Sequence, residues 1–140
     1  PPRSTLFPYT TLFRSGEALM GYPGFAECGL NIVAAFDVDP NKCHRVIHGK
    51  HVRHISKMTG LMRRMRVRFG IITVPASEAQ QAADLLIEGG VLAIWNFAPA
   101  KIQAPERVIV TNEDLYCSLA VLSQKMTRKL SESRSKAGAK

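Results

Sequence analysis

The sequence predicts an α/β protein: a Rossmann-like parallel sheet with helices on both faces. Continuous apolar runs at residues 32–36, 70–74 and 91–95 are typical of strands buried on both faces. Stretches with helical spacing of apolar residues separate these runs, as in folds that alternate strands and helices. A length of 140 residues with an apolar fraction of 46% fits one domain with a substantial core.

The stretch from Gly16 to Pro40 predicts the dinucleotide-binding part of this fold. A helix is expected to open at Gly16, and the following strand ends at Asp37, 21 residues further on. That spacing is close to the one at which such units place an acid beside the adenosine ribose hydroxyls. The full fingerprint has three glycines, but here Gly16, the last of them, is the one that remains. The motif therefore depends on its context.

Residues 1–15 are predicted to be a leader foreign to the protein. The segment at 3–7 is nearly echoed at 11–15, without an acid and without a helical period. We expect such a leader to have replaced the native first strand and whatever preceded it. The alternative is that residues 10–13 form a genuine first strand.

The rest of the chain is expected to alternate helices and strands. Pro40 suits the first position of a helix, and Asp39 can cap it. The predicted elements are a short helix from Pro40 to about Val46, a strand at 52–55, a helix from Ser56 to about Met65, a strand at 70–74, a helix at 77–88, strands at 91–95 and 108–110, and a helix that begins at 112–114.

Two strand exits carry candidate crevice residues. In a doubly wound sheet, ligands bind at the carboxyl ends of the strands. Thr73, Val74 and Pro75 are therefore expected to face a cofactor crevice. Asn96 and Phe97, at the next exit, suit amide recognition or ring stacking, or alternatively form only a turn.

Composition and charge narrow the function classes. No apolar run approaches the roughly 20 residues of a membrane span. Three widely spaced cysteines fit a reducing, cytoplasmic setting better than a disulfide frame or a zinc site. The net charge of +8 is concentrated at residues 57–68 and 125–140. The first cluster is either a nucleic-acid contact or a solvated helix face. The second is either a nucleic-acid contact or a frayed tail.

Four histidines within eleven residues raise a metal hypothesis: His44, His48, His51 and His54. Their span crosses a predicted helix, loop and strand, and no cysteine or acid lies at ligand spacing. Solvated or packed histidines are the favoured interpretation, and no metal site is predicted.

Five motifs, taken in order, resemble the Rex family of redox-sensing transcriptional repressors. They are GEALMGYPGF from Gly16, VAAFDVDP from Val33, TVPA from Thr73, NFAP from Asn96 and NEDL from Asn112. The resemblance covers about residues 16–126. It implies a homodimer with an N-terminal winged-helix domain, a Rossmann domain that binds NADH or NAD⁺, and a C-terminal helix exchanged between subunits. It also implies a repressor that leaves its operator DNA when NADH rises.

The resemblance also assigns roles to individual positions. It places Gly16 in the diphosphate loop and Asp37 at the adenosine end. Asp114 matches the acid at the start of the exchanged helix, which takes part in the family's conformational switch. No catalytic residue is implied, because the cofactor is sensed and not turned over. The residues implied to line the crevice toward the nicotinamide are Thr73, Val74, Pro75, Asn96, Phe97, Ala98 and Pro99.

The predicted organisation has four parts. These are the leader at 1–15, a Rossmann NAD(H)-binding domain at 16–112 without its first strand or a winged helix, a C-terminal dimerisation helix at 113–130 and a disordered basic tail at 131–140. We expect a cytoplasmic homodimer that reaches operator DNA through the missing winged helix and does not contact a membrane. The alternative is a CoA- or nucleotide-binding Rossmann domain of an enzyme subunit. The strand exits offer no histidine or cysteine, which favours a sensor over an enzyme.

Overall fold

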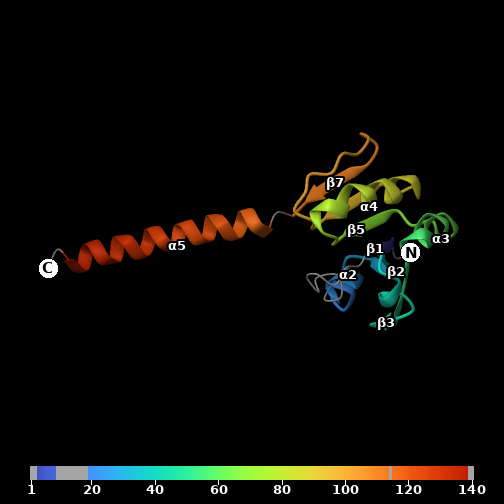
Figure 1. Ribbon diagram of the computed structural model, residues 1–140, viewed down its shortest axis with the longest axis horizontal. Helices are drawn as coiled ribbons and strands as arrows, with labels where there is room; N and C mark the ends of the chain where they lie inside the picture. The colour runs from blue at the N-terminus through green and yellow to red at the C-terminus, as the bar shows by residue number, and fades with distance from the viewer. Residues whose placement is uncertain (1–2, 9–18, 114, 139–140) are drawn as a thin grey trace.

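A parallel sheet is the centre of the computed structural model (Figure 1), which describes residues 3–8, 19–113 and 115–138. Its strand order is β3-β4-β2-β1-β5-β6-β7. Neighbouring strands run parallel, except that β3 is antiparallel to β4. The strands are β1 (Arg3–Pro8), β2 (Leu30–Asp37), β3 (Val46–Ile47), β4 (Lys50–His54), β5 (Phe69–Ile72), β6 (Ala93–Asn96) and β7 (Ile109–Asn112).

The order of the strands confirms the predicted fold class. From β1 the chain adds β2 and β4 on one side of the sheet, and then β5, β6 and β7 on the other. This reversal defines a doubly wound Rossmann sheet, in which the crevice for a ligand opens beside the first strand.

Helices cover both faces of the sheet. They are α2 (Gly24–Glu27), α3 (Met58–Met65), α4 (Ala76–Glu88) and α5 (Leu115–Gly138), with 3₁₀ turns η1 (Pro40–Lys42) and η2 (Ile55–Lys57). Successive strand residues point to opposite faces. Ile72 accordingly packs in the core cluster that contains the buried residues of α3 and α4, whereas Ile71 packs in the cluster that contains Phe25 of α2.

The position of the first strand is filled, contrary to the prediction that residues 1–15 leave it missing. β1 lies between β2 and β5, with Thr5 opposite both Ile32 and Phe69. Without a strand there, the edges of β2 and β5 would face each other unpaired, so an extended segment is stabilised by two ladders of backbone hydrogen bonds. The alternative strand at 10–13 lies outside the described residues. The foreign origin of the segment stays a prediction.

The predicted helix from Pro40 to Val46 is wrong. It is limited to η1, where the Asp39 carboxylate accepts a hydrogen bond of 2.9 Å from the Asn41 N–H. The chain then returns along β4: the His44 N–H donates to the Val52 carbonyl and the Val52 N–H to the Arg45 carbonyl, each at 2.9 Å. These hydrogen bonds replace those of a continued helix. The helix predicted to open at Gly16 is not continuous: within the described residues it consists of helical residues 19–20 and, after a break at 21–23, of α2. The predicted elements from 50 to 112 are present, with small shifts at their ends.

The C-terminal helix is longer than predicted. Residues 131–138, expected to be part of a disordered tail, belong to α5, because no proline or glycine interrupts the helix before Gly138. In Figure 1 this helix extends away from the sheet domain, and all side chains described from Ser118 to Gly138 are exposed. No helix in the described ranges combines the length and the apolarity needed to cross a membrane.

Candidate functional site

The carboxyl ends of the central strands bring most of the predicted site residues to one edge of the sheet. Ile72, at the end of β5, is the register partner of Asn96 at the end of β6. The Phe97 N–H donates to the Ile72 carbonyl at 2.9 Å, which holds the two exits together. Asp37 ends β2, on the other side of β1. Gly16 and Asp114 lie outside the described residues.

Asp37 is a buried carboxylate with one unsatisfied oxygen. Asp37 is 2% exposed, and its Oδ1 atom accepts a hydrogen bond of 2.9 Å from the Asp39 N–H. Oδ2 is buried and has no hydrogen-bond partner among the described residues. Burial raises the pKa of the Asp37 carboxyl, and the Asp39 N–H offsets part of that rise. A hydroxyl group donated by a ligand would satisfy Oδ2, so this site fits the adenosine ribose of a dinucleotide.

The exit of β5 forms a closed wall of the crevice. Thr73 and Val74 are both buried, and Pro75 is the residue that precedes the first turn of α4. The amino end of α4 therefore lies at the same edge of the sheet as Asp37. The dipole of a helix favours an anion at this end. This part of the edge is therefore formed by largely buried side chains, those of Thr73, Val74 and Pro75.

The exit of β6 is a turn held by Asn96. Its side chain is fully buried: Nδ2 donates to the Ala100 carbonyl at 2.8 Å and to Asn112 Oδ1 at 2.9 Å. Its Oδ1 accepts a hydrogen bond from the Ala98 N–H at 3.0 Å. Between the two interpretations given by the sequence, the structure favours the turn, because the amide nitrogen and Oδ1 both make hydrogen bonds within the chain. Ala98 is also buried, whereas Phe97 is half-buried and Pro99 is exposed.

An aromatic cluster behind this turn was not predicted from the sequence. The rings of Phe97 and Trp95 have centroids 4.5 Å apart, and Trp95 meets Phe25 edge to face at 6.3 Å. Phe25 in turn meets Tyr22 at 5.7 Å. The alternation of Trp95 and Phe97 along the strand places both on one face, which is the signal that could have predicted the cluster.

The cluster is connected to the chain that leads into α5. The indole N–H of Trp95 donates to the Glu113 carboxylate at 3.2 Å. The Glu113 N–H donates to the Asn96 carbonyl at 2.8 Å. Glu113 therefore ties the exit of β6 to the segment immediately before the C-terminal helix.

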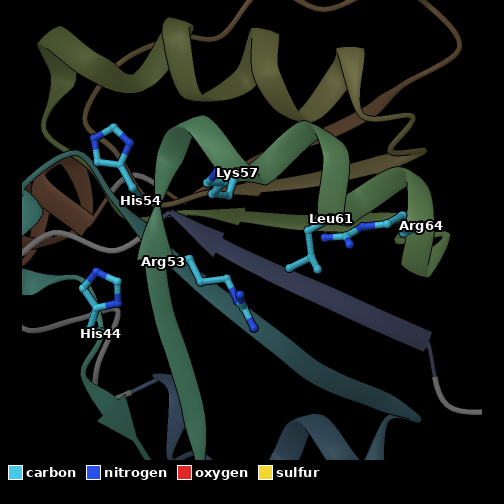
Figure 2. Close-up of a pocket in the computed structure, with 6 residues that line it drawn as sticks. All are labelled: His44, Arg53, His54, Lys57, Leu61 and Arg64. Atoms are coloured by element: carbon cyan, nitrogen blue, oxygen red, sulfur yellow. The ribbon is translucent and has the colours of Figure 1, made fainter.

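The four histidines do not form a metal centre with one another. Within the described ranges, no group of three or more His, Cys, Asp or Glu side chains lies close enough together to hold a metal ion. His44 and His54 instead line a hollow with basic side chains at the edge of β4, shown in Figure 2.

The doubly wound sheet with an acid at the end of its second strand defines a nucleotide-binding Rossmann domain. Comparison with known families agrees with this class, because the model of the CoA binding domain family matches residues 13–100. The chain therefore belongs to the CoA binding domain family.

Similar curated proteins carry the name "redox-sensing transcriptional repressor Rex". The one from Caldicellulosiruptor bescii is 38% identical over 117 residues, which is 84% of this chain and 54% of the relative. The one from Porphyromonas gingivalis is 44% identical over 111 residues, or 79% of this chain and 51% of the relative. These relatives confirm the resemblance to Rex that the motifs indicate. The chain spans about half the length of the curated relatives it matches.

Solved structures give the same result. RSP, a Rex-family repressor, in complex with beta-NADH matches 95% of this chain and 64% of its own length, with a TM-score of 0.84 and 27% identity. RSP with beta-NAD⁺ and operator DNA has a TM-score of 0.85 and matches 97% of this chain and 62% of its own. UDP-D-quinovosamine 4-dehydrogenase from Vibrio fischeri, at 12% identity and a TM-score of 0.55, shares the fold alone.

Proposed function

We propose that this chain is the NADH/NAD⁺-sensing domain of a Rex-like transcriptional repressor. The observation that carries the proposal is Asp37, whose buried Oδ2 atom lacks a partner among the described residues at the edge where a doubly wound sheet binds nucleotides. The structures of RSP with NADH and NAD⁺ support the choice of ligand.

In this proposal the residues of the crevice bind and orient; they do not catalyse. Asp37 Oδ2 accepts a hydrogen bond from a ribose hydroxyl, and the wall at Thr73–Pro75 encloses the middle of the ligand. Phe97 borders the nicotinamide end, where Asn96 fixes the turn that carries it. The cofactor supplies its redox state as the signal. None of the crevice residues named here is a histidine or cysteine that could act as a base or nucleophile, which supports a regulatory role over an enzymatic one.

We also propose that α5 is completed by a second copy of this chain. Its apolar residues Leu119, Leu122, Met126 and Leu130 recur at helical spacing and are all more than half exposed. Such a stripe on a helix that extends from its own domain needs a partner surface. Operator DNA would be contacted in the cytoplasm by the winged-helix domain that the resemblance to Rex implies; the structure of RSP with operator DNA supports a DNA partner.

A double substitution in the stripe tests the homodimer. Leu122→Glu with Met126→Glu is expected to shift the chain from dimer to monomer in light scattering, because it would bury two charges in the interface. Gln124→Glu, exposed on the opposite side of the same helix, is the matched control. A dimer that persists in the double variant would contradict this use of α5.

The ligand proposal is tested through the one tryptophan of the chain. Trp95 lies against Phe97, so its fluorescence reports on a ligand in the crevice. We expect NADH to quench Trp95 and saturate, with NAD⁺ binding more weakly. Coenzyme A is the second candidate, because the matching family is described as a CoA binding domain. Saturable quenching by coenzyme A with no response to NADH would overturn the proposal in favour of that candidate.

A further inference from the structure

A hollow of about 290 Å³ lies between the end of β4 and helix α3. We name it the basic hollow and define it by its lining residues His44, Arg53, His54, Lys57, Leu61 and Arg64. Figure 2 shows that they come from the loop after η1, from β4, from η2 and from one side of α3. Five of the six carry nitrogen donors, and no carboxylate is among them. The chemistry of this lining favours an anion.

The cations of the basic hollow differ from their neighbours in lacking partners. Arg63, one residue before Arg64, reaches the Glu88 carboxylate at 3.9 Å, and Arg68 donates to the Gly90 carbonyl at 3.1 Å. The side chains of Arg53, Lys57 and Arg64 make no ion pair or hydrogen bond with any described residue. Three uncompensated charges around one hollow repel each other, and a bound anion would relieve that repulsion.

The two histidines add further nitrogen donors to these charges. The Nδ1 atom of His54 accepts a hydrogen bond from the Ser56 N–H at 3.2 Å, so in the neutral ring the proton is on Nε2. Nε2 can therefore donate to an anion. His44 adopts a left-handed backbone conformation with φ of 69°. Such a conformation is unfavourable for a side chain with a Cβ atom and persists when the surrounding structure imposes it.

We propose that the basic hollow is a binding site for a phosphate group. Two guanidinium groups suit the paired oxygens of a phosphate, and the ammonium of Lys57 adds a point charge. His54 is the register partner of Asp37 across β2 and β4, so the hollow borders the adenosine end of the crevice. The phosphate is either a substituent on the adenosine ribose, as in NADPH or coenzyme A, or a free phosphate ion. The first source rests on the proposed nucleotide site; the second does not.

Histidine ring resonances in NMR spectra of the full 140-residue chain provide the direct test. Titration with inorganic phosphate, at constant ionic strength, is expected to shift the ring signals of His44 and His54 with a common saturation curve. His48 and His51, outside the lining, are internal controls and are expected to stay in place. Equal, non-saturating shifts of all four histidines, or no shift, would overturn the proposal.

Substitutions then locate the site. Arg53→Gln with Arg64→Gln should weaken phosphate binding by about tenfold or more, because two charge-assisted contacts are lost. Arg66→Gln, exposed on the adjacent turn and outside the hollow, is the matched control and should bind phosphate as the parent does. Unaltered backbone NMR signals elsewhere show that a variant is folded. Unchanged phosphate affinity in the folded double variant would overturn the proposal.

The source of the phosphate follows from competition. If NADPH or coenzyme A displaces inorganic phosphate from His44 and His54 and NADH does not, the phosphate is carried on the ribose. If none of them displaces it, the site takes a free phosphate ion. Both results require the same basic hollow. NADH binding measured in the double variant reports separately on the proposed function, because neither arginine belongs to the Asp37 site.

Discussion

The two ends of the crevice are built in opposite ways. At the end of β2, Asp37 is buried with one oxygen that no described residue satisfies. At the end of β6, Asn96 is equally buried, but its amide nitrogen and its Oδ1 both have hydrogen-bond partners, in its own loop and in Asn112. Without a ligand, the buried oxygen of Asp37 lowers the stability of the fold, whereas the hydrogen bonds of Asn96 stabilise the fold with or without a ligand. A buried polar residue at a strand exit is thus a candidate ligand contact only when part of its hydrogen-bonding capacity is left over.

The largest expected effect is on the Asn96 side. Asn96→Ala removes all hydrogen bonds of this side chain and leaves the buried Ala98 N–H without its partner, so it should lower the free energy of unfolding by about 2–4 kcal/mol. Urea denaturation followed by circular dichroism measures this loss. Asn41→Ala, at an exposed site, is the control and should change stability by less than about 0.5 kcal/mol. A loss that small for Asn96→Ala would show that the turn does not depend on its amide.

At Asp37, a substitution is expected to change the free energy of unfolding in the opposite direction. Asp37→Asn removes a desolvated charge and should leave the free energy of unfolding unchanged or raise it by up to about 1 kcal/mol near neutral pH. A raised native pKa means that the folded state binds the proton more tightly than the unfolded state. This contribution to stability is present below the ordinary pKa of 3.8 and is lost as the pH rises through the raised native value.

Denaturation curves of both proteins at several pH values check that sign. The advantage of Asp37→Asn over the parent should grow from acid to neutral pH. Glu106→Gln, at an exposed position, is the control variant measured beside it. A variant that is less stable than the parent at neutral pH would mean that Asp37 is satisfied within the chain.

The smallest expected effect is on the link between the β6 exit and α5. Glu113→Ala removes the hydrogen bond from the Trp95 indole and should lower stability by about 0.5–1 kcal/mol. It should also change the Trp95 emission spectrum, because the indole loses a charged acceptor. Glu106→Ala, at an exposed position, is the control. An unchanged emission spectrum would show that the indole is not held by Glu113.

The sequence was informative where one physical signal dominates. The apolar run that ends at Asp37 predicted β2 and the position of its acid, and the helical spacing of apolar residues at 77–88 predicted α4, which packs on the sheet. Gly70 is part of that packing: a Cβ atom there would come within 2.7 Å of the Leu86 side chain. Periodicity and burial agree in these segments, so local pattern and tertiary structure give the same result.

The remaining features depend on partners distant in sequence. β1 is stabilised by two strands that the repeat-like composition of 3–8 does not indicate. Residues 43–47 join β4 and so do not continue η1 as a helix. One hydrogen bond of the Asn96 amide is made to Asn112, sixteen positions away. The residues that line the basic hollow come from four separate segments of the chain. Such pairings are set by the assembled sheet and cannot be read from spacing along the chain.

Calorimetric titration of the 140-residue chain with NADH, beside Asp37→Asn, tests the central claim most directly. We expect saturable binding to the parent chain. The variant should bind at least about tenfold more weakly, because a neutral amide oxygen accepts a weaker hydrogen bond from a ribose hydroxyl than a carboxylate does. Equal affinity of the two proteins for NADH, or no binding of NADH to the folded parent, would contradict the assignment of Asp37 as the adenosine contact of a redox sensor.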